Sequence, residues 1–95
     1  MNEFIKNTVS RYFSLEFKAN NGEDRVRKSG LKGSLWIKRR YDGFRLQTTS
    51  DIATILDGEI ERVQGSPVGE QKGYKYWYIN DFHIVEKIIE ILARP

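Results

Sequence analysis

Apolar and polar residues alternate over 11–18, near the start of the chain. A period of two is typical of a strand with one buried face. The apolar members of this pattern are Phe13, Leu15 and Phe17. The pair Asn21-Gly22 follows and favours a two-residue type I′ turn, so the sequence predicts a return strand over 23–28. The expected cross-strand pairs are Phe17 with Val26, Lys18 with Arg25, and Glu16 with Arg27.

A second hairpin is predicted over 35–49, where Asp42-Gly43 is a strong signal for a type I′ turn. With these two residues as the loop, Arg40 lies opposite Arg45. Alternation then predicts a mostly apolar inner face and a cationic outer face with one exposed tryptophan. The inner face comprises Leu35, Ile37, Arg39, Tyr41, Phe44, Leu46 and Thr48. The outer face comprises Trp36, Lys38, Arg40, Arg45, Gln47 and Thr49.

The middle of the chain predicts a short helix followed by a weak strand. Ser50 or Asp51 can cap a helix of one or two turns, and Gly58 is placed to end it in the left-handed conformation. The residues 59–63 then indicate a weak strand, and 65–69 read as a plain loop rich in glycine.

The last third of the chain predicts a strong strand and the main core helix. The run 74–79 has the strongest β-propensity in the sequence. Asn80 or Asp81 can cap the helix that follows, whose apolar stripe indicates one buried side. The stripe consists of Phe82, Val85, Ile88, Ile89 and Leu92, widened by Ile84 and Ile91.

These elements predict one α+β domain over 1–95. Its antiparallel sheet contains two hairpins plus two further strands, with a short middle helix and a C-terminal amphipathic helix packed on one face. A sheet with one covered face leaves the other free. Residues 1–8 are expected to form either a short helix or an unpaired arm, and 29–34 a flexible basic loop.

Charge changes the picture more than overall composition does. The chain has 95 residues and a net charge of +3, but 25–49 carry eight basic residues against one acidic residue. Such asymmetry can mark an electrostatic footprint on one side of a domain. The sequence has no cysteine, so a cytoplasmic location is expected. Neither a signal peptide nor an apolar run of membrane-spanning length is present, so no membrane partner is expected.

Catalysis finds little support among the residues. Glu16 and Lys18 resemble the end of a metal-dependent nuclease motif, but that chemistry also needs an upstream acid on a neighbouring strand, and only Glu3 precedes them. His83 is the single histidine and has no cysteine companion, which argues against a zinc site. We therefore expect a protein that is not an enzyme and that uses no metal or cofactor.

The cationic outer face points instead to an anionic partner. Like charges directly opposite each other cost roughly 0.2–1 kcal/mol per pair, so folding alone would not select Arg40 beside Arg45. The run 74–79 adds aromatic surface in either orientation: its three tyrosines face outward if Trp77 and Ile79 face the helix, and Trp77 faces outward otherwise. Cations beside aromatics suit phosphate contact and base stacking.

The sequence therefore predicts a small nucleic-acid-binding protein, with single strands favoured slightly over a duplex. The expected binding residues are Arg25, Arg27, Lys28, Lys32, Trp36, Lys38, Arg40, Arg45, Gln47, Tyr74, Tyr76 and Tyr78. Three alternatives remain open. The same face could dock onto an acidic protein partner, as in an inhibitor or adaptor. The basic residues could merely guard exposed strands against edge pairing, or exposed strands could pair to form a homodimer.

Overall fold

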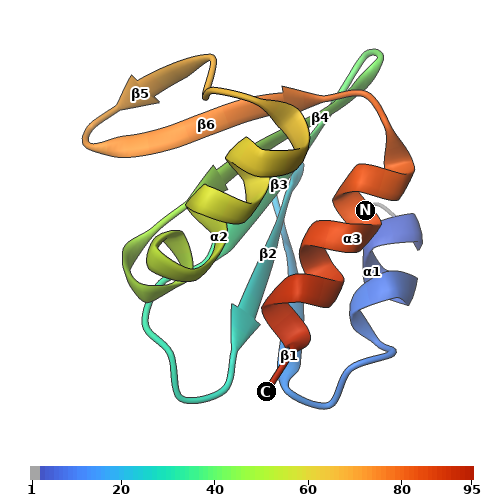
Figure 1. The fold of residues 1–95 in the computed structure, drawn as a ribbon. Helices are drawn as coiled ribbons and strands as arrows, with labels where there is room; N and C mark the ends of the chain where they lie inside the picture. Colours follow the sequence, from blue (N-terminus) through green and yellow to red (C-terminus); the bar gives the residue numbers. More distant parts are fainter. Residues whose placement is uncertain (1–2) are drawn as a thin grey trace.

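A computed structural model describes residues 3–95 and contains three helices on one six-stranded antiparallel sheet (Figure 1). The order of strands in the sheet is β1-β2-β3-β4-β6-β5. The elements are α1 (Glu3–Val9), β1 (Leu15–Asn20), β2 (Glu23–Lys28), β3 (Leu35–Arg40), β4 (Gly43–Thr48), α2 (Ser50–Gln64), β5 (Gly69–Gln71), β6 (Tyr74–Ile79) and α3 (Phe82–Ala93).

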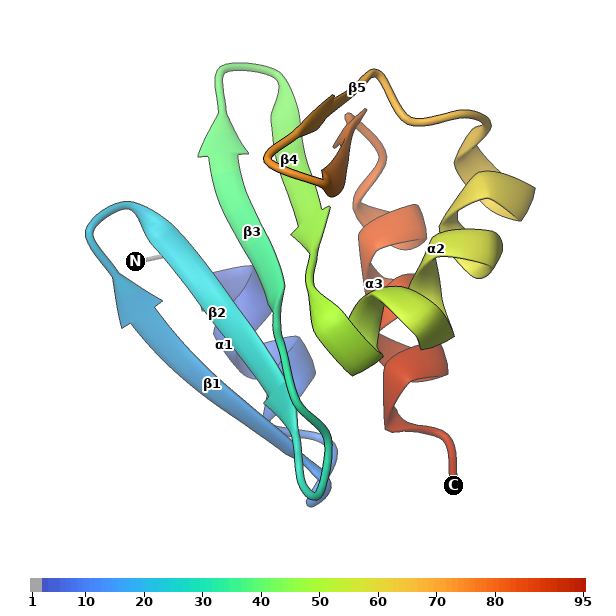
Figure 2. The same ribbon diagram turned by 90° about the vertical axis from the view of Figure 1, so that its left-hand side faces the viewer.

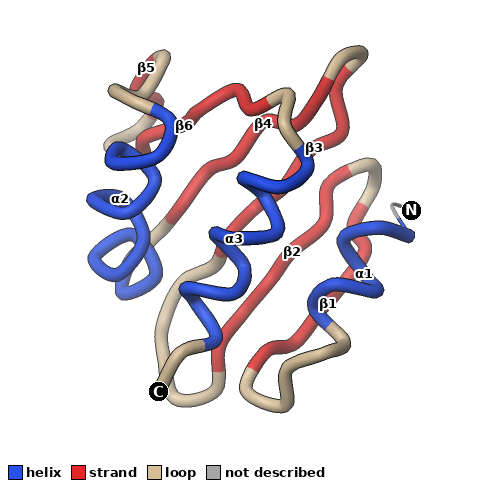
Figure 3. Tube along the Cα trace, turned by 45° about the vertical axis from the view of Figure 1, so that its right-hand side comes forward, coloured by secondary structure: helices blue, strands red, loops and turns tan. Residues whose placement is uncertain are grey.

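All three helices lie on the same side of the sheet, with α3 between α1 and α2 (Figure 3). The predicted α+β class, with an antiparallel sheet and a C-terminal helix packed against it, is confirmed. The opposite side of the sheet carries no helix of the described chain. No helix within residues 3–95 is both long and apolar enough to cross a membrane.

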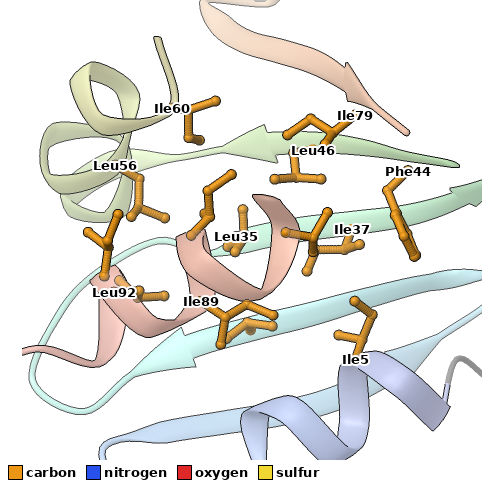
Figure 4. Close-up of a cluster of buried hydrophobic side chains, with 14 of the residues drawn as sticks. Ile5, Leu35, Ile37, Phe44, Leu46, Leu56, Ile60, Ile79, Ile89 and Leu92 are labelled. Atoms are coloured by element: carbon orange, nitrogen blue, oxygen red, sulfur yellow. The ribbon is translucent and has the colours of Figure 1, made fainter. Parts of the chain in front are cut away.

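The hydrophobic core fills the space between the helices and the covered side of the sheet (Figure 4). Its strand residues alternate with exposed or half-buried ones, as the period of a strand requires. Its helix residues recur at the spacing of one helical face. The largest fully buried side chains include Trp77, Phe44, Ile5, Leu35, Ile37, Leu46, Ile52, Leu56, Ile60, Ile79, Ile88 and Ile89.

The first hairpin has the predicted turn and register. Asn21 and Gly22 have φ angles of 46° and 85°, as a type I′ turn requires, and the three predicted cross-strand pairs are all present. The strand begins later than the predicted 11–18, because hydrogen bonds such as that from the Leu15 N–H to the Tyr12 carbonyl form tight turns after α1. The predicted burial of Phe13 is consequently wrong: its side chain is fully exposed.

The turn of the second hairpin lies one residue earlier than predicted, which moves each cross-strand partner by two residues. Arg40 pairs with Gly43, so Tyr41 and Asp42 form the loop, and Arg45 lies opposite Lys38 rather than Arg40. A Cβ on Gly43 would overlap the Ile79 carbonyl oxygen and lie 2.7 Å from the Asn80 Cα, so this glycine serves the close approach of β6.

Because each cross-strand partner changes by two residues, every side chain in the paired strands keeps its predicted face. Leu35, Ile37, Phe44, Leu46 and Thr48 are buried as predicted. The predicted inward position of Tyr41 is wrong, because this residue lies in the loop and is fully exposed. Arg39 belongs to the covered side as predicted but is exposed, and its guanidinium stacks on the rings of Phe44 and Phe82.

The middle helix is longer than predicted. α2 continues through Gly58 to Gln64, so the predicted stop at Gly58 and the predicted strand over 59–63 are both wrong. The apolar residues Ile52, Leu56 and Ile60 are spaced by four and are all buried, which stabilises the helix across the glycine. Gly65, with a φ of 97°, ends it.

The predicted loop over 65–69 leads directly into a third hairpin that the sequence reading missed. Lys72 and Gly73 have φ angles of 54° and 81°, a type I′ turn that joins β5 to β6. Asp81 caps α3 as one of the two predicted candidates, since its side chain accepts a hydrogen bond from the His83 N–H. At the start of the chain, Glu3–Val9 is helical, and residues 1–2 of the predicted arm or helix lie outside the described residues.

The loop over 29–34 is held at its C-terminal end. The backbone N–H of Lys32 donates to Asp51, and the N–H of Ser34 donates to the Thr49 hydroxyl. Gly33 has a φ of 91° and lies directly against the Thr49 carbonyl. The mobility of this segment stays a prediction.

One partly buried contact between the sheet and α2 gives a testable pH dependence. The Thr48 hydroxyl donates to the Asp57 carboxylate. Burial raises the pKa of Asp57, while the Thr48 hydroxyl and the nearby Lys75 ammonium act in the opposite direction. A raised pKa means that the folded state binds the proton more tightly than the unfolded state, so this carboxyl favours folding more as pH falls from neutral towards about 4.

We therefore expect Asp57→Asn, which has no titrating group, to be most favourable relative to the natural protein at neutral pH. As pH falls through the raised pKa of Asp57, the natural protein should gain stability relative to the variant. Urea unfolding of both proteins at neutral and mildly acidic pH measures this difference. A difference that stays constant, or that moves the other way, would contradict the inferred burial of the charge.

Candidate functional site

The side of the sheet opposite the helices, here called the open face, is formed by alternate residues of all six strands. Their neighbours along each strand, such as Val26, Ile37, Leu46 and Trp77, point into the core. The open face combines six basic, two acidic, four aromatic and three amide side chains. They are Lys18, Arg25, Arg27, Lys38, Arg40 and Arg45; Glu16 and Glu23; Trp36, Tyr74, Tyr76 and Tyr78; and Asn20, Gln47 and Gln71.

The orientation of β6 resolves the alternative that the sequence left open. Trp77 and Ile79 are each 1% exposed and face the helices, so the three tyrosines of β6 belong to the open face. Tyr74 and Tyr78 are exposed to 42% and 46%, and Tyr76 is half-buried.

Strand pairing arranges the open face in two rows that cross the sheet. One row runs Lys18, Arg25, Trp36, Gln47 and Tyr76; the other runs Asn20, Glu23, Lys38, Arg45 and Tyr78. Two like-charged pairs stand directly opposite each other in these rows, Lys18 with Arg25 and Lys38 with Arg45. Each such pair costs roughly 0.2–1 kcal/mol, and a bound anion would remove that cost.

The basic side chains of the open face make no ion pair with any described residue. Each ion pair of the described chain instead has its acidic partner in a helix. The one strand residue among them is Lys75, which lies on the covered side of β6. The pairs are Arg11 with Glu86, Arg62 with Glu59, Lys75 with Glu61, His83 with Glu86, and Arg94 with Glu90. The ion-paired acidic side chains therefore lie on the helices, and the open face, with six basic and two acidic side chains, keeps a net excess of positive charge.

Three arginines of the open face stack on aromatic rings instead. The guanidinium carbon lies 5.3 Å from the ring centroid for Arg25 over Trp36, 5.7 Å for Arg40 over Tyr78, and 4.5 Å for Arg45 over Tyr76. Each contact contributes about 0.5–1 kcal/mol at an exposed site. Arg25 also donates through its Nε to the Ser34 hydroxyl at 2.7 Å, and a guanidinium carries five N–H donors, so each arginine retains further N–H groups that suit phosphate oxygens.

Arg45 is half-buried among its neighbours on the open face. Its Nη2 donates to the side-chain oxygen of Gln71 at 3.2 Å, whereas its Nε is buried and has no hydrogen-bond partner among the described residues. A buried donor without a partner costs about 1–3 kcal/mol. The ring of Tyr76 and the amide of Gln71 hold this side chain at the centre of the face despite that cost.

The open face has only a small hollow at its centre. The hollow lined by Glu23, Trp36, Lys38, Arg45 and Gln47 has a volume of only about 10 Å³. A larger hollow of about 630 Å³ lies on the covered side of the sheet, where Glu3 and Phe4 of α1 approach the turn between β1 and β2. Asp24 also lines it, and burial raises the pKa of that carboxyl. The shape of the open face thus suits an extended ligand rather than a small molecule.

Ten of the twelve predicted binding residues share the open face. The exceptions are Lys28 and Lys32. Lys28 lies two residues after Val26 in β2, so it shares the covered side of the sheet with Val26. Its ammonium donates to the Arg94 carbonyl there. Lys32 lies in the loop after β2 and lines a hollow of about 390 Å³ with Arg27 and Glu16, at one end of the open face.

Several members of the open face were missing from the predicted set. Lys18 could have been found, since the confirmed register already placed it beside Arg25 on the outer side. Gln71 could not be placed without the third hairpin, whose signal was the glycine immediately before the tyrosine-rich strand.

Within residues 3–95, no group of three or more histidine, cysteine, aspartate or glutamate residues is placed to hold a metal ion. Comparison of the chain with protein-family models, with curated proteins and with solved structures gave no significant match.

Proposed function

We propose that this chain is a small non-enzymatic nucleic-acid-binding protein whose open face contacts phosphates and stacks against bases or sugars. One observation carries the proposal: six basic side chains without ion pairs among the described residues are interleaved with four aromatic side chains on one face of the sheet. A polyanion supplies the negative charge that this face lacks, and several of its phosphates can contact the face at once.

A single strand fits this face better than a duplex. Its bases can stack on the free side of an aromatic ring or on a guanidinium plane, both of which occur in single-strand recognition. A duplex offers its phosphates but keeps its bases stacked on each other. The aromatic side chains would then contribute little, so a preference for single strands is expected.

Salt dependence gives the primary test. If the open face engages about four to six phosphates, the affinity for a single-stranded oligonucleotide should fall roughly a hundredfold between about 50 and 200 mM salt. Changing Lys38→Ala together with Arg45→Ala should reduce the slope of log affinity against log salt by about 1.4. Fluorescence anisotropy of a labelled oligonucleotide measures both quantities.

The matched control is Lys6→Ala together with Lys87→Ala, which removes the same charge from α1 and α3. These residues lie on the helix side of the molecule, so the slope should change little. Unfolding in urea should give similar stability for both double variants. The substitutions at Lys38 and Arg45 remove the contact of Arg45 with Tyr76, but they also remove a like-charged pair, and the two effects oppose each other. Absence of binding at low salt, or equal slopes for the two variants, would refute the proposal.

A second candidate is docking of the open face onto an acidic protein. Tryptophan, tyrosine and arginine dominate the binding energy of many protein interfaces, and all three are present here. Affinity capture from lysate treated with nuclease separates the candidates. A stoichiometric protein partner that survives this treatment, and that Lys38→Ala with Arg45→Ala releases, would favour the second.

A further inference from the structure

β1 is an edge strand with a free backbone edge. Within residues 3–95 it pairs only with β2, and it lies at one end of the sheet, while α1 lies behind it (Figure 2). At the other end of the sheet, β5 has only three residues. Short edge strands offer few hydrogen bonds to another chain, whereas β1 has six residues and no proline.

The register of the first hairpin determines which backbone groups face this edge. Asn20 and Glu23 flank the two-residue turn and therefore form a hydrogen-bonded pair. Because such pairs alternate with non-hydrogen-bonded ones, the outward groups belong to Leu15, Phe17 and Ala19. The Leu15 N–H already donates to the Tyr12 carbonyl at 3.2 Å. The Leu15 carbonyl and both backbone groups of Phe17 and Ala19 remain directed outward.

The side chains along this edge are self-complementary. Glu16 and Lys18 flank Phe17 and point to the open face. If a second copy pairs antiparallel about a two-fold axis at Phe17, each Glu16 lies opposite Lys18 of the other copy. These are non-hydrogen-bonded pairs, in which side chains stand closest together. Moving the axis to Glu16 would place the two Glu16 side chains together, and moving it to Lys18 would do the same for the lysines, so charge selects one register.

Apolar contacts on the covered side of the sheet fit the same register. Phe17 and Leu15 are only partly buried, and Ala19 is exposed. About the axis at Phe17, the two Phe17 side chains become neighbours, and each Leu15 lies opposite Ala19 of the second copy. The hydrogen bonds match as well: Phe17 pairs with Phe17, and the Ala19 N–H reaches the Leu15 carbonyl.

We propose that this chain forms a symmetric dimer through antiparallel pairing of its β1 strands, centred on Phe17. The two sheets then join into one, and both open faces lie on the same side of it. A two-fold axis makes the contact self-limiting, since the same edge serves both copies and no second long edge remains. The inference concerns the edge of the sheet and does not depend on what the open face binds.

Charge exchange provides a direct test. Sedimentation velocity should show a monomer–dimer equilibrium for the natural protein as its concentration is raised towards the millimolar range. Glu16→Lys and Lys18→Glu each turn both cross-copy pairs into like-charged ones, so each should weaken the dimer about tenfold or more. The double exchange Glu16→Lys with Lys18→Glu restores opposite charges in the same register, and dimerisation should return.

Mixing the two single variants offers a further readout. Glu16→Lys has lysine at both positions and Lys18→Glu has glutamate at both, so a one-to-one mixture should form a heterodimer although neither variant dimerises well alone. Ala19→Pro removes an outward N–H without touching the hydrogen bonds to β2, and it should also weaken the dimer. Circular dichroism and thermal unfolding verify that each variant is folded.

The result that would overturn the proposal is a natural protein that remains monomeric throughout the concentration range. A dimer that the single charge reversals leave unchanged would equally place the contact elsewhere. If the reversals weaken the dimer but neither the double exchange nor the mixture restores association, the register about Phe17 is wrong.

Discussion

Replacing Trp77 with alanine is expected to lower the free energy of unfolding by about 3–5 kcal/mol. Trp77 is 1% exposed and is the largest side chain in the core. Its indole N–H donates to the Gly65 carbonyl at 3.1 Å, which ties β6 to the end of α2. Alanine would leave a cavity between sheet and helices and would leave that carbonyl without this donor. Denaturant unfolding, followed by circular dichroism, measures the loss.

The second tryptophan supplies the matched control. Trp36 lies on the open face, where it contacts the Arg25 guanidinium rather than the core. Trp36→Ala should therefore change the free energy of unfolding by no more than about 1 kcal/mol. If the proposed function is correct, the same variant should lose affinity for single-stranded nucleic acid. Similar destabilisation by the two substitutions would contradict the division of the sheet into a core side and an open side.

Replacing Gly43 with alanine is expected to lower the free energy of unfolding by about 1–3 kcal/mol. A Cβ at this position would overlap the carbonyl of Ile79 and lie 2.7 Å from the Asn80 Cα, so β4 and the end of β6 would have to separate. Backbone cannot swing aside as a side chain can. The cost should therefore appear as a lower midpoint of denaturant unfolding with an unchanged slope.

A glycine in α2 should respond in the opposite direction. A Cβ on Gly58 would meet no heavy atom within 4 Å, and the residue lies inside the helix. Gly58→Ala should raise the free energy of unfolding by about 1 kcal/mol, because alanine loses less backbone entropy in a helix. If both substitutions shifted stability in the same direction, the close approach at Gly43 would not be the cause.

These two glycines also mark where the sequence was a poor guide. Glycine after aspartate is a usual signal of a type I′ turn. Gly43 instead lies outside the loop, where it allows the close approach of a strand that is more than thirty positions away, and a local sequence pattern cannot reveal that contact. Glycine in the middle helix looked like a stop. The buried stripe of Ile52, Leu56 and Ile60 continues across it, so tertiary packing outweighs the local preference.

The faces of the strands were more predictable than their pairing. In the second hairpin the observed partner of each residue differs from the expected one by two residues, and a displacement of two keeps each side chain on its assigned face. Trp36, Lys38 and Arg45 therefore share a face although their expected partners differ. Parity also explains Lys28: it follows Val26 by two residues, so its position on the covered side was available from the sequence. The stacking of arginines on rings was not available, since it depends on which strands become neighbours.

The one-sided packing of the helices separates two sets of residues that evolution can treat independently. Substitutions at the inward positions of a strand change the volume available to the interior, whereas those at the alternate positions leave the core in place and alter mainly what the sheet presents to its surroundings. The residues of the open face can therefore vary while the packing that holds the helices to the sheet is kept. Because alternate residues of each strand face opposite sides of the sheet, the residues that determine the core are separate from those exposed on the open face.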